Sequence, residues 1–251
     1  SGKKLDSLKS CVVGGSACPR FMMEKFYEKY GVEVLHCWGM TETSPIGTIN
    51  RPLAKHYGQS FSERLDVAVK QGRPVYGVEI KITDENDVTL PNNGKDFGNL
   101  WIRGPWICSG YLNIEKSETH GEDNWFMTGD VATIDEDGFM QITDRTKDVI
   151  KSGGEWISSI EIENFAVGHP SVMEAGVIGV FHPKWDERPL LIIVKNENAK
   201  VSKEEILDFL KDKIVSWWMP DDVVFVESLP HTATGKIQKL ALREQFKDYK
   251  F

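Results

Sequence analysis

The chain has 251 residues, of which 40% are hydrophobic and 27% charged, so it can bury a core large enough for one or two domains. Its formal net charge of -8 at pH 7 argues against general nucleic-acid binding, which depends on an excess of Lys and Arg. No apolar run approaches the roughly 20 residues of a membrane span, and the opening segment has no apolar signal core.

The four cysteines are scattered, with no C-x-x-C pair and no matching cluster of histidines. They predict neither a zinc site nor a disulfide framework, and they favour a reducing cytoplasm. Because an initiating Met is absent and the first motif lies close to the start, we expect that the chain was cut from a longer one.

The first elements alternate between strand and helix. Residues 11–13 predict a strand, Pro19 opens a helix that Gly31 ends, and residues 32–35 predict a second strand. Together they predict a βαβ unit of a parallel sheet. The apolar residues at helical spacing in this helix are Phe21, Met22, Phe26 and Tyr30. Residues 51–74 are polar and hard to assign.

After Gly77, short alternating strands separated by glycine and proline turns predict a small β-rich subdomain. The pattern changes again after residue 145. Two later helix starts have the pattern of a capping box, in which two side chains satisfy each other's free backbone N–H. The paired residues are Ser158 with Glu161 and Ser202 with Glu205. Further helices are expected over 160–166, over 203–215 and from 238, and strands over 175–181, 190–195 and 223–226. We therefore place a domain boundary near residue 144.

Four polar stretches have both a structural and a functional interpretation. Residues 14–19 form a glycine turn before a helix, which is either an ordinary connection or a place where a ligand approaches the backbone. Residues 36–45 follow the second strand, where ligands tend to bind in parallel sheets. In this stretch Trp38 can stack on a base or pack in the core, and Glu42 can help to hold Mg²⁺ or serve as a turn residue.

The third stretch contains Asp130, which can accept hydrogen bonds from a ribose diol, and Arg145, which offers a fixed set of donors. Its DRTKD run can equally be a solvated surface. The fourth contains Lys236, which is either an exposed lysine or a charge that a loop moves into a closed site. The occurrence of all four in this order favours the functional interpretation.

The GGSACP, HCWGMTE, TGD, DRTKDVIKSGGEWIS and TATGKIQK stretches resemble the successive motifs of the adenylate-forming superfamily of acyl-CoA synthetases, luciferases and adenylation domains. The resemblance covers almost the whole chain. It implies a fold that is α/β and α+β. Residues 1–144 would be the C-terminal part of the large AMP-binding domain, a βαβ unit plus a small β-rich subdomain. Residues 145–251 would be the small, mobile C-terminal lid domain.

The resemblance also implies a nucleotide site. Thr41 would bond the α-phosphate, Glu42 would support Mg²⁺, Asp130 and Arg145 would hold the ribose hydroxyls, and Lys236 would stabilise the adenylation transition state. The residues or backbone implied to border adenine are Gly15, Ser16, Ala17, His36, Cys37, Trp38 and Ile142. Lys147 would be the pivot of the small domain. The border of the CoA pantetheine tunnel would be formed by Lys151, Ser152, Gly153 and Gly154, and the acyl pocket would include Gly39 and Met40.

By resemblance, a fatty or alkyl carboxylic acid reacts with ATP to give acyl-AMP, and CoA then takes the acyl group as a thioester. The implied cofactors are ATP/AMP, Mg²⁺ and coenzyme A, and a homo-oligomer is left open. The family's Ser/Thr/Gly-rich phosphate loop is not in these 251 residues, so we expect the fragment alone to be inactive. Two alternatives stay open. One is an adenylation enzyme with a carrier-protein acceptor, and the other is a non-catalytic nucleotide-binding fragment.

Overall fold

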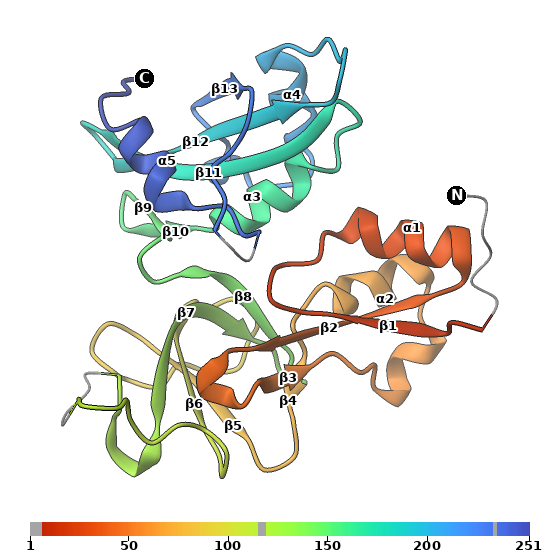
Figure 1. Cartoon of the computed structure of the whole chain (residues 1–251), viewed down its shortest axis with the longest axis vertical. Coiled ribbons are helices and arrows are strands. Elements are labelled where there is room, and N and C mark those ends of the chain that lie inside the picture. Colours follow the sequence, from red (N-terminus) through yellow and green to blue (C-terminus); the bar gives the residue numbers. More distant parts are fainter. Residues whose placement is uncertain (1–6, 115–118, 233–234) are drawn as a thin grey trace. The chain divides into compact units, whose positions relative to one another are not determined.

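The computed structural model describes residues 7–114, 119–232 and 235–251. The chain divides into two compact units, Ser1–Ile142 (unit 1) and Thr143–Phe251 (unit 2). Figure 1 shows that each unit contains both helices and strands, so the protein has the mixed α/β architecture expected from the sequence. In the part of the chain that the structure describes, no helix is both long and apolar enough to cross a membrane.

The first sheet of unit 1 contains the predicted βαβ unit. Its order is β1-β2-β3-β4, with β1 parallel to β2 and Val12 opposite Leu35. The carboxyl ends of two neighbouring parallel strands meet at one edge of a sheet, which brings the loops that follow β1 and β2 together. The elements of this region are β1 (Ser10–Val13), α1 (Arg20–Tyr30), β2 (Glu33–Gly39), η1 (Thr41–Thr43), β3 (Ile46–Ile49), η2 (Ala54–Gly58), α2 (Phe61–Ala68) and β4 (Arg73–Pro74).

A second sheet, of order β5-β6-β7-β8, forms the expected β-rich part. Its core contains Ile82, Leu100 and Met140, each fully buried, and Trp38 from β2 packs against the same cluster. Residues of β2 therefore contact both the first sheet and this β-rich part. The elements are β5 (Glu79–Thr83), β6 (Gly98–Arg103), η3 (Glu122–Asn124), β7 (Phe126–Ile134) and β8 (Met140–Arg145).

Unit 2 is built on a sheet of order β10-β9-β12-β11, with β13 beside β12. Side chains alternate along β12, so Leu191 and Ile193 pack in one core cluster with residues of α3 and α4, whereas Leu190 and Ile192 pack in another with Leu242 of α5. The elements are β9 (Ile150–Ser152), β10 (Glu155–Ile157), α3 (Ser159–Ala166), β11 (Val172–His182), β12 (Asp186–Lys195), α4 (Lys203–Leu210), η4 (Ser216–Trp218), β13 (Asp222–Val226) and α5 (Lys239–Gln245).

The structure corrects the end of one predicted helix and adds detail in two other segments. In α1 the fully buried apolar residue is Met23, whereas Phe21 and Met22 are exposed. The helix expected over 203–215 ends at Leu210, because the chain continues as turns up to η4. Residues 51–74, which had no assignment, contain α2 with a full capping box of its own, Ser60 with Glu63.

The two predicted capping boxes differ in the structure. Ser202 and Glu205 each accept from the other's backbone N–H, at 3.2 and 2.7 Å. At α3, Ser158 accepts from the backbone N–H of Glu161 at 3.1 Å, and its hydroxyl donates to the carbonyl oxygen of Thr143 at 2.6 Å. The Ser158 cap therefore also ties α3 to β8.

Candidate functional site

The loop after β1 lies directly against β2. A Cβ added to Gly14 would lie 2.5 Å from Cys37 Sγ and 3.2 Å from the carbonyl oxygen of Cys37, so only glycine fits there without a shift. Gly15 has a φ of +85°, in the region that favours glycine. The structure therefore brings the predicted adenine residues 15–17 and 36–38 together within unit 1.

His36 is 1% exposed, and its ring lies between two backbone carbonyl groups. Nδ1 lies 2.9 Å from the carbonyl oxygen of Val69, and Nε2 lies 3.4 Å from that of Ser16. A neutral imidazole has a single N–H, so we assign the hydrogen to Nδ1, which makes the shorter contact. Burial lowers the pKa of His36, although both carbonyl contacts oppose this change. The imidazole thus donates to the Val69 carbonyl, and its Nε2 lies beside the carbonyl of Ser16 in the glycine loop without a hydrogen bond to it.

Trp38 connects β2 to the predicted ribose residue. Its Nε1–H donates to Asp130 Oδ2 at 2.9 Å, and Asp130 is 4% exposed on β7. The indole packs in the same cluster as Ile142, which the sequence also assigned to the base. Trp38 is therefore a core side chain, one of its two interpretations from sequence, and it orients the Asp130 carboxylate.

Thr41 and Glu42 lie on η1, directly after β2. Tyr111 Oη donates to Glu42 Oε1 at 2.8 Å, and the backbone N–H of Cys108 donates to the Glu42 carbonyl oxygen at 2.8 Å. Burial, together with the Glu42 contact, raises the pKa of Tyr111 to about 12. Sequence reasoning missed Tyr111, because nothing in its local pattern indicates a partner so far away in the chain. Thr41 itself is exposed.

Gly39 and Met40, the predicted acyl-pocket residues, are constrained by the backbone and the core. A Cβ at Gly39 would lie 1.8 Å from the carbonyl oxygen of Pro45, so any side chain at this position requires the turn to move. Thr43 holds that turn, since its Oγ1 accepts from the Met40 N–H at 2.9 Å and donates to the Pro45 carbonyl at 2.6 Å. Met40 packs beside the cluster of Val78, Ile102 and Phe126.

In unit 2, Arg145 and Lys147 lie in an exposed turn at the end of β8. The backbone N–H of Arg145 donates to Asp144 Oδ1 at 2.8 Å, and the Arg145 carbonyl accepts from the N–H groups of Asp148 and Val149 at 2.8 and 2.9 Å. The turn therefore has a defined backbone shape while both cationic side chains reach the surface.

The predicted CoA residues form the turn between β9 and β10. Gly153 and Gly154 have φ values of +59° and +87°, and a Cβ at Gly153 would lie 3.1 Å from Trp185 and 3.2 Å from Trp217. Ser152 is fully buried and accepts from Arg188 Nη1 at 3.2 Å. The two tryptophans and Arg188 were missed from sequence. Lys151 is exposed.

Lys236 is exposed, in a loop closed by a bridge between His231 and Ile237. The Thr232 N–H donates to the Lys236 carbonyl at 2.8 Å, and the Lys236 N–H donates to Thr232 Oγ1 at 3.2 Å. These two hydrogen bonds fix the backbone where the loop starts and ends, while the Lys236 side chain is exposed. Residues 233 and 234 of the predicted motif lie outside the described residues.

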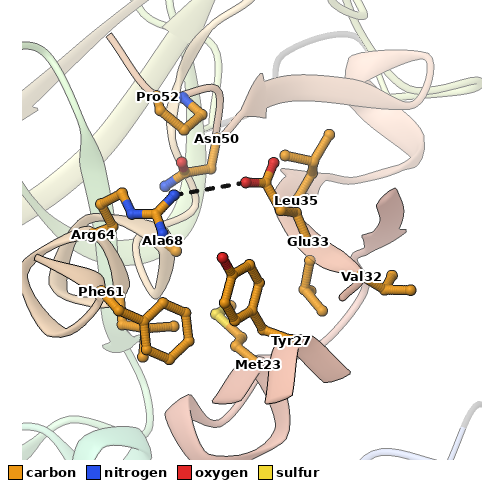
Figure 2. Close-up of a pocket in the computed structure, with 12 residues that line it drawn as sticks. Met23, Tyr27, Val32, Glu33, Leu35, Asn50, Pro52, Phe61, Arg64 and Ala68 are labelled. Atoms are coloured by element: carbon orange, nitrogen blue, oxygen red, sulfur yellow. Dashed lines mark ion pairs between the residues drawn. The ribbon is translucent and has the colours of Figure 1, made fainter. Parts of the chain in front are cut away.

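Figure 2 shows a cavity in unit 1 that is separate from these positions. α1, the start of β2 and α2 line it, with Tyr27 and Phe61 on its walls. Arg64 approaches Glu33 across it at 3.8 Å, and the buried Arg64 Nε has no hydrogen-bond partner among the described residues. Of the residues that the structure describes, none assigned from sequence to the site lines this cavity.

Comparison with known proteins gives the same assignment for both parts of the chain. The family model for AMP-binding enzymes matches residues 1–112, and the model for the AMP-binding enzyme C-terminal domain matches residues 161–236. The ATP-bound crystal structure of MatB from Rhodopseudomonas palustris aligns with a TM-score of 0.80 at 32% identity, over 95% of this chain and 46% of that one.

Two curated relatives are more similar in sequence. A 3-methylmercaptopropionyl-CoA ligase of Ruegeria lacuscaerulensis is 53% identical over 98% of this chain and 46% of its own length. A medium-chain-fatty-acid–CoA ligase of Ectopseudomonas oleovorans is 52% identical over 99% of this chain and 45% of its own length. The chain thus spans about half the length of the curated relatives it matches. With both family models matched in order and this identity throughout, the chain belongs to the AMP-binding enzyme family.

Proposed function

We propose that this chain is part of an AMP-forming acyl-CoA synthetase, an acid–thiol ligase that activates a fatty or alkyl carboxylic acid with ATP and passes the acyl group to CoA. One observation carries the proposal. Three successive residues of β2 contact two other predicted motifs: His36 and Cys37 lie against the loop of residues 14–16, and Trp38 donates a hydrogen bond to Asp130. The Thr41–Glu42 turn follows directly.

In this proposal, unit 1 receives the nucleotide. The Gly15–Ala17 loop and the β2 backbone border adenine, and Asp130 accepts hydrogen bonds from the ribose diol. Thr41, exposed on η1, donates to the α-phosphate. Mg²⁺ is usually held by one or two carboxylates together with substrate phosphates, so the single Glu42 carboxylate, oriented by Tyr111, fits this ion. When bound, Mg²⁺ would neutralise phosphate charge.

Unit 2 supplies the charge for the first step and the surface for the second. The carboxylate of the acid attacks the α-phosphorus of ATP, forming acyl-AMP and expelling pyrophosphate. Lys236 would stabilise the negative charge that develops there. After the small unit turns about Lys147, the Ser152–Gly154 turn with Lys151 would border the pantetheine of CoA, whose thiolate attacks the acyl carbonyl and expels AMP. Arg145 would add donors to the ribose.

The relatives' names support a CoA acceptor and an alkyl acid. A carrier-protein acceptor or a non-catalytic nucleotide-binding fragment would be the conclusion if CoA were not used. Gly39 and Met40 stay our proposal for the acyl pocket. A reducing cytoplasm stays our proposal for the compartment.

The test uses Lys236→Ala in the full-length enzyme and follows the two half-reactions separately. We expect acyl-AMP formation from ATP to fall by about 10²-fold or more, as it does when an electrostatic donor to a transition state is removed. Conversion of supplied acyl-AMP and CoA to acyl-CoA should hardly change, because this contact belongs to the first step.

Lys247→Ala is the matched control, since Lys247 is an exposed lysine of unit 2 that pairs with neighbouring Glu244 at 2.7 Å. Its rates should equal those of the unchanged enzyme. Unchanged rates in Lys236→Ala would make Lys236 a surface lysine and remove its proposed role. Equal loss in both steps would indicate misfolding of unit 2, which circular dichroism detects.

A further inference from the structure

The end of β8 is tied into unit 2 by the first turn of α3. Ser158 Oγ donates to the Thr143 carbonyl at 2.6 Å, the Ser159 N–H donates to Asp144 Oδ2 at 2.9 Å, and Ser159 Oγ donates to the same carboxylate oxygen. Asp144 is 1% exposed, so its carboxylate oxygens take their hydrogen bonds from these partners rather than from solvent. If Asp144 moves away from these donors, its carboxylate needs other hydrogen-bond donors in their place.

Lys239, the first residue of α5, completes this cluster. Its Nζ lies 3.0 Å from Glu163 Oε1 and 3.8 Å from Asp144 Oδ1, and it donates to Ser159 Oγ. Burial lowers the pKa of Lys239, but Glu163 and Asp144 outweigh burial and raise it above its ordinary value of 10.5. The ammonium therefore stays charged at neutral pH and pairs with Asp144 in this structure.

One helical turn further along α5, Arg243 binds the other end of the same segment. Its Nη1 lies 2.6 Å from Asp148 Oδ1, and its Nη2 donates to the Asp148 carbonyl at 3.3 Å. Residues four apart share a face of a helix, so α5 holds Asp144 with Lys239 and Asp148 with Arg243. Between these two anchors lie Arg145 and Lys147.

We propose that Asp144 is a latch, gripped by Ser159 and Lys239 in only one of the two poses of the small unit, and that Lys239 is thereby a positioning residue. This inference rests on the proposed function, in which the small unit turns about Lys147. Asp144 precedes that pivot and Asp148 follows it. Turning therefore breaks the Asp144 contacts with α3 and α5 but keeps the contact between Arg243 and Asp148.

The two anchors differ in their effect because a contact made in one pose alone changes the balance between poses, whereas a contact made in both does not. The Asp144 latch thus sets how much of the enzyme is ready for each half-reaction. The Arg243 anchor stabilises unit 2 in both poses. This difference supplies a matched control on the same helix.

The experiment compares Ser159→Ala, Lys239→Met and Arg243→Met in the full-length enzyme. For each variant, the rate of acyl-AMP formation and the rate of thioester formation from supplied acyl-AMP are measured, together with Tm. We expect the ratio of the two rates to change by about tenfold in Ser159→Ala and in Lys239→Met, in the same direction, as the loss of a charge-assisted hydrogen bond from one state predicts. Arg243→Met should lower Tm and keep the original ratio.

Ser159→Ala keeps the backbone donor to Asp144, so it is the milder variant and should fold even if Lys239→Met does not. Lys239→Arg, which retains the charge, should restore part of the ratio. The latch is overturned if Ser159→Ala keeps the original ratio, or if Arg243→Met changes the ratio as much. Failure of the unchanged enzyme to form acyl-AMP would instead refute the proposed function.

Discussion

At the scale of single residues, two side chains of the candidate site, Trp38 and His36, contact other parts of the protein in addition to their proposed place near the nucleotide. Trp38 had two interpretations from sequence, stacking on a base and packing in the core; in the structure its ring packs in the core and its N–H donates to Asp130. His36 has its ring turned to backbone carbonyls. In the proposed site these residues position others, so their contributions should be measurable as changes in the free energy of unfolding.

Trp38→Phe should retain much of the core packing and remove the donor to Asp130. A hydrogen bond to a charged group contributes about 1.5–3 kcal/mol, so we expect a loss of that order in the free energy of unfolding, together with a raised KM for ATP. Trp101→Phe is the control, because Trp101 Nε1 donates to the neutral Thr83 Oγ1 at 3.0 Å. It should cost about 0.5–1.5 kcal/mol and leave the KM unchanged. Equal effects on KM would remove the proposed role of Asp130.

His36 should make stability depend on pH. Its pKa in the folded chain lies below the ordinary 6.5, so the unfolded chain binds more protons just below that pH. The contribution of neutral His36 to the free energy of unfolding is complete above about pH 6.5 and is lost as the pH falls through its pKa in the folded chain. Urea titrations should therefore show that the free energy of unfolding falls between about pH 7.5 and about pH 5, and that it falls less in His36→Gln. Equal drops in both proteins would contradict the assignment.

At the scale of elements, the connection from β1 to α1 shows how a glycine turn and a strand define one surface. Gly14 lies so close to Cys37 that the loop follows the strand, and Gly15 then turns with a positive φ. The helix after this loop begins with Arg20, and Pro19 is its N-cap residue. Local chemistry thus shapes the loop, and the neighbouring strand fixes its position.

Gly14→Ala should overpack this contact, because the new Cβ would lie 2.5 Å from Cys37 Sγ. Overpacking in a close-packed region costs about 1–3 kcal/mol of unfolding free energy. Adding Cys37→Ala removes the sulfur and should recover part of that loss, whereas the remaining 3.2 Å approach to the Cys37 carbonyl keeps the recovery incomplete. Chemical denaturation of both single variants and the double variant gives the coupling. Strict additivity would show that Cys37 does not determine the cost.

At the scale of the whole molecule, the candidate site divides between the two units. Asp130 and Glu42 belong to unit 1, whereas Arg145, Lys147 and Lys236 belong to unit 2. β8 crosses the boundary, so the latch proposed at Asp144 lies on the segment that connects them. In the proposed function, the two half-reactions differ in how one unit is turned against the other.

The 251-residue chain by itself should not catalyse carboxylate-dependent exchange of pyrophosphate into ATP. It does not contain the Ser/Thr/Gly-rich phosphate loop that the family resemblance implies and spans about half the length of its relatives, while positioning supplies much of the rate in phosphoryl transfer. The full-length ligase of Ruegeria lacuscaerulensis is the positive control. Robust exchange by the purified chain would show that these residues suffice to grip the triphosphate.

The sequence by itself determined the features that depend on neighbours a few residues apart. The βαβ unit, the β-rich part, the stop at Gly31 and the reciprocal cap of Ser202 with Glu205 all follow from periodicity, glycine conformation or local hydrogen bonding. Where local signals were mixed, as in residues 51–74, the sequence predicted less than the structure contains, since α2 forms there. Motif resemblance added the family.

Only the tertiary structure decided which distant side chains hold the predicted ones. Tyr111 binds Glu42 across 69 positions of the chain, Trp38 binds Asp130 across 92, and Lys239 reaches Ser159 across 80. No periodicity or local motif encodes such pairs, because they arise when the hydrophobic cores bring remote strands and helices together and buried polar groups must then find partners.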